Sequence, residues 1–102
     1  MRKKNEQNFL EDLFNIIKIK SKSKDSQSYT KFLLKSGKNK IAQKVGEEST
    51  ELIVDYLSGS KKRTINEAAD LIYHLFVLLY SKKINLTDIK KELLKRHNVR
   101  HK

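Results

Sequence analysis

The sequence of 102 residues contains no cysteine and no proline, and it has only three glycines. The lack of cysteine excludes disulfide bonds and metal sites built on thiolates, and it fits a reducing compartment. With so few helix-breaking residues and no alternating run of β-branched residues, α-helix is the secondary structure to expect throughout. We therefore predict one all-α domain, because a chain of this length can bury one modest core.

Long apolar runs and targeting signals are also missing. The longest apolar stretch, LIYHLFVLLY at 71–80, is far short of the roughly 20 residues that a membrane-spanning helix needs. The basic segment 1–20 has neither a long apolar core nor a small-residue cleavage site, so it does not resemble a secretory signal. These absences predict a protein that is not secreted by such a signal and has no membrane partner.

Acidic residues are scarce, and the formal net charge is +11. One hypothesis is therefore a basic, helical nucleic-acid-binding protein. However, most of the 23 basic residues are lysines scattered along the chain, and arginine, which binds bases and phosphates with two hydrogen bonds, is rare. We favour a solvated, lysine-rich surface with no nucleic-acid partner, and its field could steer an anionic small substrate.

The apolar pattern predicts four to five helices. The expected ranges are 5–20, 28–37, 38–58, 60–82 and 85–97. Ser28 can cap the short second helix and Gly37 can end it, while Gly59 separates the two long helices. The segment KSKSKDSQ has nothing to bury, so we expect a linker there. The predicted organisation is an N-terminal helix with this linker at 1–27, an all-α core at 28–98 and a basic tail at 99–102.

Acidic side chains gather on one edge of the helix predicted at 38–58. Within roughly 100° of arc, at 100° per residue, this edge carries Lys44, Glu47, Glu48, Glu51 and Asp55. A solvated polar face is the simplest interpretation of this helix alone. Yet like charges three or four residues apart repel one another, and this edge does not alternate its signs.

The next helix carries a second polar edge. Glu67, Asp70 and His74 fall within about 60° of arc, and most other positions are apolar. A helix that is apolar nearly all round lies centrally in its fold, so a carboxylate on it must be paired, hydrogen-bonded or bound to a metal. A structural pairing of Asp70 with His74 or with a lysine is the alternative to a metal site.

The two edges share one spacing. Glu48 and Glu51 are three residues apart, as are Glu67 and Asp70. If the two helices form an antiparallel hairpin through the turn at 58–60, these four carboxylates can converge. Oxygen ligands of this kind select Mg²⁺ or Mn²⁺ over zinc, and Mg²⁺ held by carboxylates keeps positions open for water and substrate phosphates. The sequence therefore predicts a metal site that meets a polyphosphate.

These motifs also resemble a known family. The pattern Glu47-Glu48-x-x-Glu51, a spacer, and then Glu67-x-x-Asp70 resembles that of the all-α nucleotide pyrophosphohydrolases of the MazG-like superfamily. The segments SYTKFLL, KIAQKVGEESTELIV, NEAADLIYHLFVLL and LTDIKKELLKRH are most similar to its phosphoribosyl-ATP pyrophosphatase branch. The pair Ser49-Thr50 departs from the small apolar residues often found there.

The resemblance implies a MazG-like helical bundle completed by dimerisation, so a homodimer is expected. It also implies a cytoplasmic location. It implies Mg²⁺-dependent hydrolysis of phosphoribosyl-ATP to phosphoribosyl-AMP and pyrophosphate in histidine biosynthesis, with Mn²⁺ as a substitute. By that pattern the metal ligands are Glu48, Glu51, Glu67 and Asp70. Glu47 would support these ligands or orient water, and the base that takes the proton of the attacking water is expected to be Glu48 or Glu51. In this chain the activity is expected to stand alone, without the cyclohydrolase domain often fused to relatives.

Other residues are candidates for substrate contacts. Lys40 and Lys44 precede the acidic edge and could bind phosphates, although Lys40 could equally be a surface lysine. Ser28 and Tyr29 could contact the substrate, or serve only as a helix cap and a core tyrosine. We expect His74, on the same face as Asp70, to be a hydrogen-bonded partner behind the metal ligands rather than a ligand or a base.

A second enzymatic hypothesis is a house-cleaning nucleoside triphosphate pyrophosphohydrolase of the same superfamily. It would use the same carboxylates and differ in the contacts to base and sugar. The nucleic-acid-binding hypothesis differs from both, because it predicts indifference to Asp70→Asn and a steep dependence of binding on salt.

Overall fold

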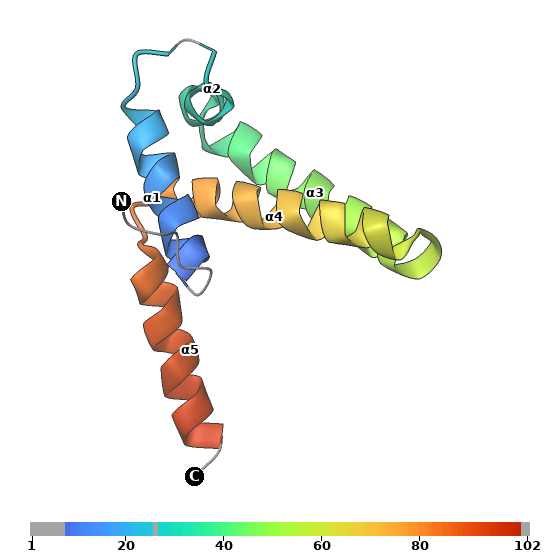
Figure 1. Cartoon of the computed structure of the whole chain (residues 1–102). Coiled ribbons are helices and arrows are strands. Elements are labelled where there is room, and N and C mark those ends of the chain that lie inside the picture. Colours follow the sequence, from blue (N-terminus) through green and yellow to red (C-terminus); the bar gives the residue numbers. More distant parts are fainter. Residues whose placement is uncertain (1–7, 26, 101–102) are drawn as a thin grey trace, which may run out of the picture.

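The computed structural model describes residues 8–25 and 27–100, and these residues form five helices and no strand. The helices are α1 (Phe9–Ser21), α2 (Tyr29–Ser36), α3 (Lys38–Ser58), α4 (Lys61–Ser81) and α5 (Leu86–Arg100). The all-α prediction is confirmed (Figure 1). Residues 5–7 of the predicted first helix, and residues 101–102 of the predicted tail, lie outside the described residues.

Local signals place the helix ends close to the predicted positions. The Ser28 hydroxyl accepts a hydrogen bond from the backbone N–H of Lys31 at 3.2 Å and caps α2. Gly37 joins α2 to α3 with φ +92°, a left-handed conformation that favours glycine. The Ser60 hydroxyl caps α4 by accepting from the backbone N–H of Arg63 at 3.1 Å.

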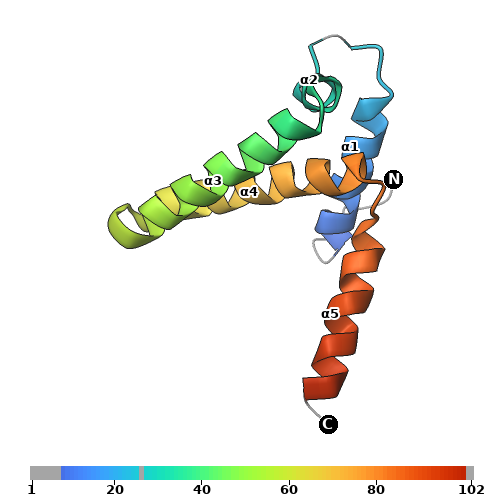
Figure 2. The ribbon, with the colours of Figure 1, turned by 180° about the vertical axis from the view of Figure 1, so that it is seen from behind.

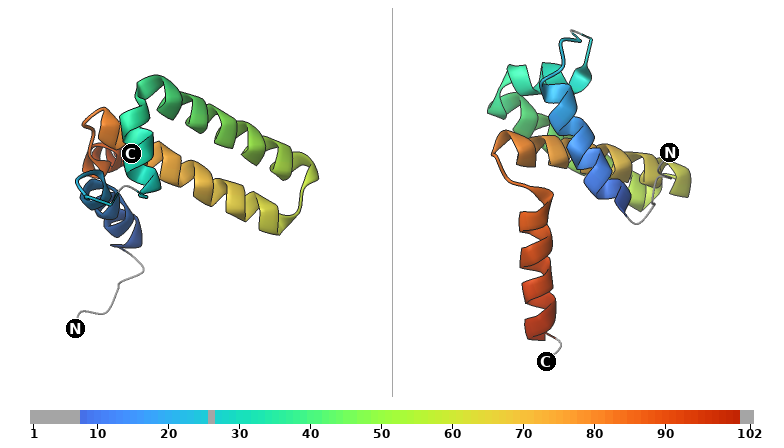
Figure 3. Two further views of the ribbon diagram at one scale, coloured as in Figure 1. Left: turned by 90° about the horizontal axis from the view of Figure 1, so that it is seen from above. Right: turned by 60° about the vertical axis from the view of Figure 1, so that its left-hand side comes forward.

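Helices α3 and α4 form an antiparallel hairpin that projects from the body as an arm (Figures 1 and 3). At its tip, the buried Asp55 carboxylate accepts a hydrogen bond from Arg63 Nε at 3.0 Å. The Asp55 carbonyl accepts from the Gly59 N–H at 2.8 Å and from the Thr64 hydroxyl at 3.2 Å. Asp55 thus shares a helical edge with the other acids but holds the hairpin turn.

The hydrophobic core lies where α1 and α2 meet the inner ends of the arm. Its buried apolar side chains are Phe14, Ile17, Leu33, Ile41, Phe76, Val77 and Leu79. Phe14 and Phe76 pack edge to face with ring centroids 5.4 Å apart. Each fully buried apolar side chain of this kind contributes about 1.5–3 kcal/mol, so this junction anchors the arm to the body.

Helix α5 leaves the body in its own direction (Figure 2). It packs on the core through the half-buried Leu86 and Ile89, and Lys90 forms an ion pair with Glu11 of α1. None of the described helices has the length and apolarity needed to cross a bilayer.

Candidate metal centre

Three carboxylates from the two arm helices meet at one point. One carboxylate oxygen from each of Glu48, Glu67 and Asp70 lies within 4.8 Å of the other two. Helix α3 supplies Glu48, and α4 supplies Glu67 and Asp70 one turn apart. Glu48 is buried, Glu67 half-buried and Asp70 exposed, so the trio opens from the protein interior toward solvent.

Two oxygens of this trio have no hydrogen-bond donor. Glu48 Oε2 and Glu67 Oε2 are buried, and neither has a partner among the described residues. A buried carboxylate oxygen without a donor is costly, and such atoms are rare in folded proteins. A divalent cation would satisfy both oxygens, and the all-oxygen donor set fits Mg²⁺ or Mn²⁺.

The closeness of the carboxylates changes their titration. Burial, a hydrogen bond to Glu51 and the charges of Glu51 and Glu48 together raise the pKa of Glu67 to about 7. Carboxylates that share a site cannot all ionise at low cost, so Glu67 gives up its proton only as the pH rises through about 7. A cation bound there would replace this proton.

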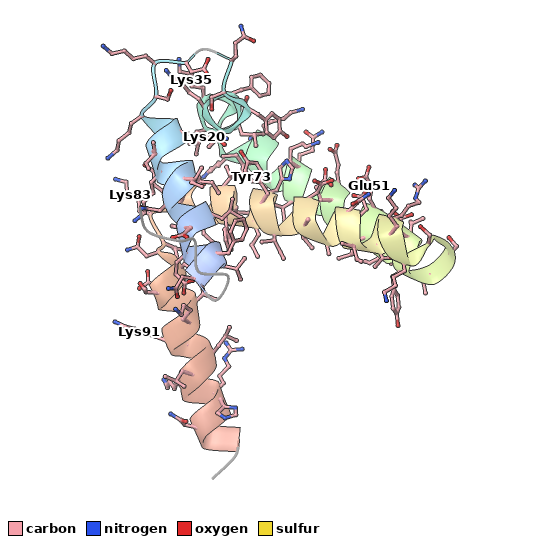
Figure 4. The ribbon with its side chains drawn as sticks, in the orientation of Figure 1. Lys20, Lys35, Glu51, Tyr73, Lys83 and Lys91 are labelled. Atoms are coloured by element: carbon pink, nitrogen blue, oxygen red, sulfur yellow. The ribbon has the colours of Figure 1, made fainter. Side chains whose placement is uncertain are left out.

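Glu51 lies on the arm (Figure 4). It interacts with Glu67 but does not belong to the tight trio. It is exposed on α3 and faces a cavity of about 210 Å³ toward the hairpin tip. The cavity is lined by Thr50, Glu51, Val54, Asp55, Arg63 and Glu67. Of the four predicted metal ligands, the structure thus joins three closely and places the fourth next to one of them.

Lys44 lies at the edge of the carboxylate trio. Its Nζ is 3.4 Å from Glu47 Oε1 and 3.6 Å from Glu48 Oε1. Burial lowers the pKa of Lys44, but Tyr29, Glu47 and Glu48 outweigh it and raise the pKa overall. Hydrogen bonds from Gln43 and Lys44 lower the pKa of Glu47, whose carboxylate therefore stays ionised outside the trio.

Tyr29 connects α2 to the site. Its hydroxyl lies 2.8 Å from His74 Nε2, and His74 Nδ1 lies 2.7 Å from the backbone carbonyl of Asp70. Since the carbonyl can only accept, Nδ1 donates the hydrogen bond to Asp70, and Nε2 is hydrogen-bonded to the Tyr29 hydroxyl. Burial raises the pKa of Tyr29, the charge of Lys44 opposes this shift, and the Glu48 and Asp70 carboxylates add to it. His74 therefore bonds the Asp70 backbone and holds Tyr29.

Lys40 and Ser28, the remaining candidates for substrate contacts, lie farther from the carboxylate trio. Lys40 is half-buried one turn before Lys44, and its charge helps to lower the pKa of Glu47. The Ser28 hydroxyl accepts from a backbone N–H as the cap of α2, which confirms the capping interpretation. A contact of Ser28 with substrate stays a prediction.

Sequence reasoning missed Tyr73 and Thr30. The Tyr73 hydroxyl is hydrogen-bonded to the hydroxyl of the buried Thr30, and the Tyr73 ring stacks on Tyr29 with centroids 6.2 Å apart. A tyrosine within a mostly apolar stretch needs a partner for its hydroxyl, and this feature of the sequence could have identified Tyr73. The pair fixes α2 against α4 beside the carboxylates.

The chain is similar to a known protein family and to a protein of similar length. Residues 10–97 match the family model described as phosphoribosyl-ATP pyrophosphohydrolase. A phosphoribosyl-ATP pyrophosphatase of Sulfurisphaera tokodaii is 48% identical over 89 residues, which cover 87% of this chain and 95% of that protein.

Two bifunctional proteins are also similar. The histidine biosynthesis bifunctional protein HisIE of Bacteroides thetaiotaomicron is 46% identical over 90 residues, covering 88% of this chain and 44% of the relative. The HisIE protein of Staphylococcus aureus is 37% identical over 92 residues, covering 90% of this chain and 44% of the relative. The chain therefore spans less than half the length of these bifunctional relatives.

Proposed function

Because the chain belongs to the phosphoribosyl-ATP pyrophosphohydrolase family, we propose that it hydrolyses phosphoribosyl-ATP to phosphoribosyl-AMP and pyrophosphate in histidine biosynthesis. The observation that carries this proposal is the meeting of Glu48, Glu67 and Asp70, with two buried oxygens that lack donors. We also propose that the protein is cytoplasmic, because a phosphorylated nucleotide intermediate of histidine biosynthesis would be its substrate.

Mg²⁺ is the proposed metal, with Mn²⁺ as a substitute. Glu48, Glu67 and Asp70 would hold it, and Glu51 would complete the ligand set beside Glu67. A bound Mg²⁺ would neutralise the carboxylates and polarise the phosphoryl group under attack. The raised pKa of Glu67 supports this assignment, because the trio needs a positive charge at neutral pH.

Water is the proposed nucleophile, and its attack would break the bond between the α and β phosphates. Glu51 is the best-placed acceptor for the proton of this water, because its carboxylate is exposed toward the neighbouring cavity. Glu48 is less suited, since one oxygen lies near Lys44 and the other is buried. Glu47 would act indirectly by fixing the ammonium group of Lys44.

Positive and hydroxyl groups beside the trio would bind the phosphates. Lys44 would stabilise the negative charge that develops on the leaving pyrophosphate, and Lys40 would add a longer-range attraction. Tyr29, held by His74, would position the substrate from α2, with Ser28 at the start of the same helix. The positive charges of Lys44 and Lys40 would thus offset part of the negative charge of the phosphates.

We also propose a homodimer in which a second copy covers the arm. Large apolar side chains are exposed along it, namely Ile53, Val54, Tyr56, Leu57, Ile65, Ile72 and Leu75. Tyr56 and Leu57 are 75% and 74% exposed, and large exposed apolar side chains that gather on one part of a fold are typical of a protein interface. Leu57→Glu should give a monomer in sedimentation equilibrium, whereas Ile19→Glu on α1, where Ile19 is 65% exposed, should leave the dimer intact. A dimeric Leu57→Glu protein would contradict this interface.

The decisive experiment measures pyrophosphate release from phosphoribosyl-ATP with Mg²⁺ and with chelator, for the wild type and Asp70→Asn. Glu92→Gln, which changes an exposed acid on α5, is the matched control. Metal-dependent release that is lost only in Asp70→Asn supports the proposal. Release from ordinary nucleoside triphosphates but not from phosphoribosyl-ATP would favour the house-cleaning enzyme. Salt-sensitive nucleic-acid binding with no hydrolysis would remove the enzymatic assignment.

A further inference from the structure

A second cavity lies at the other end of the molecule from the carboxylate trio. It has a volume of about 440 Å³ and is bordered by the end of α1 and by the connection from α4 to α5. Its wall includes Lys18, Lys22, Tyr80, Lys83, Ile84 and Asn85. In Figure 4, Lys20 and Lys83 lie on the α1 side of the molecule, away from Glu51 on the arm. A cavity of this volume suits a small organic ligand.

The charged side chains that line this cavity are all lysines. Among the described residues, no carboxylate lies within ion-pair distance of Lys18, Lys22 or Lys83. Lys18 Nζ instead lies 5.7 Å from the centre of the Phe14 ring. Three ammonium groups around one cavity create a field that attracts anions.

The cavity also has an ordered, partly apolar wall. The Tyr80 hydroxyl and the Ser21 hydroxyl are hydrogen-bonded at 2.9 Å, which ties the end of α4 to the end of α1. Ile84 is half-buried against the core. A ligand with an organic body and a negative group would therefore find complementary surfaces.

Lys83 has an unusual backbone for its residue type. Its φ is +63°, and it is the non-glycine residue with positive φ among those described. The N–H of Ile84 returns to the carbonyl of Leu79 at 2.9 Å, the hydrogen bond of a helix end at which glycine is the usual residue. A lysine is strained in this conformation. We infer that the ammonium group of Lys83, which glycine lacks, compensates for this strain by its function.

We propose that this cavity binds a small phosphate-bearing anion, with Lys18, Lys22 and Lys83 around the phosphate and Tyr80 and Ile84 against the organic part. The site is separate from the carboxylate trio and goes beyond phosphoribosyl-ATP hydrolysis. The competing explanation is that the lysines only offset the negative ends of α1 and α4. That explanation accounts for their charge but not for the strained lysine at position 83.

The test uses the full-length protein in chelator, so that binding is measured without hydrolysis. Inorganic pyrophosphate and AMP are titrated separately by NMR, following the signals of Tyr80 and Ile84 at the cavity and of Tyr29 at the carboxylate site. We expect shifts at Tyr80 and Ile84 with both probes. Tighter binding of AMP would identify an organic phosphate as the ligand, and tighter binding of pyrophosphate would identify the free anion.

Three variants decide whether the lysines bind the anion. Lys22→Gln and Lys83→Gly should each weaken binding about fivefold, the effect of one lost charge near the surface. Lys83→Gly should also raise Tm, because glycine relieves the strain. Lys35→Gln, on the last turn of α2 and outside the cavity, should change neither quantity.

The proposal is overturned if Lys83→Gly binds both probes as tightly as the wild type. It is also overturned if no binding is detected, or if the shifts map to Tyr29 instead of Tyr80. Because no turnover is measured, these results are independent of whether the chain hydrolyses phosphoribosyl-ATP.

Discussion

The carboxylate trio on the arm and the lysine-lined cavity beside α1 are opposite in more than charge. Glu48 and Glu67 each bury an oxygen without a donor, whereas Lys22 and Lys83 stay exposed to water. Burial makes a like-charge cluster costly, so the trio demands a counter-ion, while hydrated ammonium groups tolerate one another. We therefore expect the buried carboxylate trio to bind its counter-ion more tightly than the exposed lysines bind an anion.

The largest expected effect concerns the trio itself. Asp70→Asn should lower kcat/KM for pyrophosphate release by more than about 100-fold, since even groups that only support a metal ligand are worth 10- to 100-fold. In chelator, its Tm should equal or exceed that of the wild type, because one like charge has been removed. Activity within tenfold of the wild type would show that the trio does not bind the essential metal. Anion binding at the lysine cavity should not change.

The next effect concerns the turn at the tip of the arm, which is tightly packed around Gly59. A Cβ added at Gly59 would lie 2.6 Å from Asp55 Oδ1 and 2.9 Å from Asp55 Cα, so Gly59→Ala must shift the turn. We expect a loss of about 1–3 kcal/mol in the free energy of unfolding, measured by urea denaturation. Gly46→Ala is the control, since no atom lies within 4 Å of its Cβ position, and it should stabilise α3 by about 0.5–1 kcal/mol. Equal stabilities of the two variants would contradict the tip contact.

The pH dependence of stability should arise at the trio. The pKa of Glu67 is about 7 in the folded protein against an ordinary value of 4.5, so the folded state holds a proton that the unfolded state loses in this window. The contribution of Glu67 to stability is therefore full below pH 4.5 and is lost as the pH rises through about 7. Thermal unfolding in chelator should show this decline, and Glu67→Gln or added Mg²⁺ should abolish it. A decline that persists in Glu67→Gln would assign it to another group.

The smallest effect is expected at Lys44, where the two kinds of charge meet. Lys44→Gln should raise KM for phosphoribosyl-ATP about fivefold, because one partly exposed ammonium near a phosphate is lost. Lys91→Gln on α5 is the control, as it removes the same charge far from the arm. Identical steady-state kinetics for the two variants would remove Lys44 from the substrate site.

Much of the arm could be predicted from the sequence. The ends of α3 and α4 follow from Gly37, Gly59 and Ser60, and the positions found lie within one or two residues of those expected. The trio could also be predicted. Helical periodicity places Glu48 on an edge of α3, and it places Glu67 and Asp70 on an edge of α4. The two-residue turn between these helices brings the two edges together. Local rules suffice where a site lies within one hairpin.

Within that hairpin, the sequence by itself determined which residues face the site, since a helix repeats its faces every 3.6 residues. Tertiary structure alone decided which acids meet across the hairpin: Glu48 joins Glu67 and Asp70, Glu51 borders a cavity and Asp55 holds the turn. These differences depend on how far α3 is rotated against α4, which periodicity does not specify.

Contacts between distant segments were also decided only by the tertiary structure. Tyr29 reaches His74 across 45 positions, and the lysine cavity joins residues of α1 to the end of α4. Such contacts exist because burying Phe14, Leu33 and Phe76 in one core brings three helices together, and packing of this kind leaves no periodic trace in the sequence.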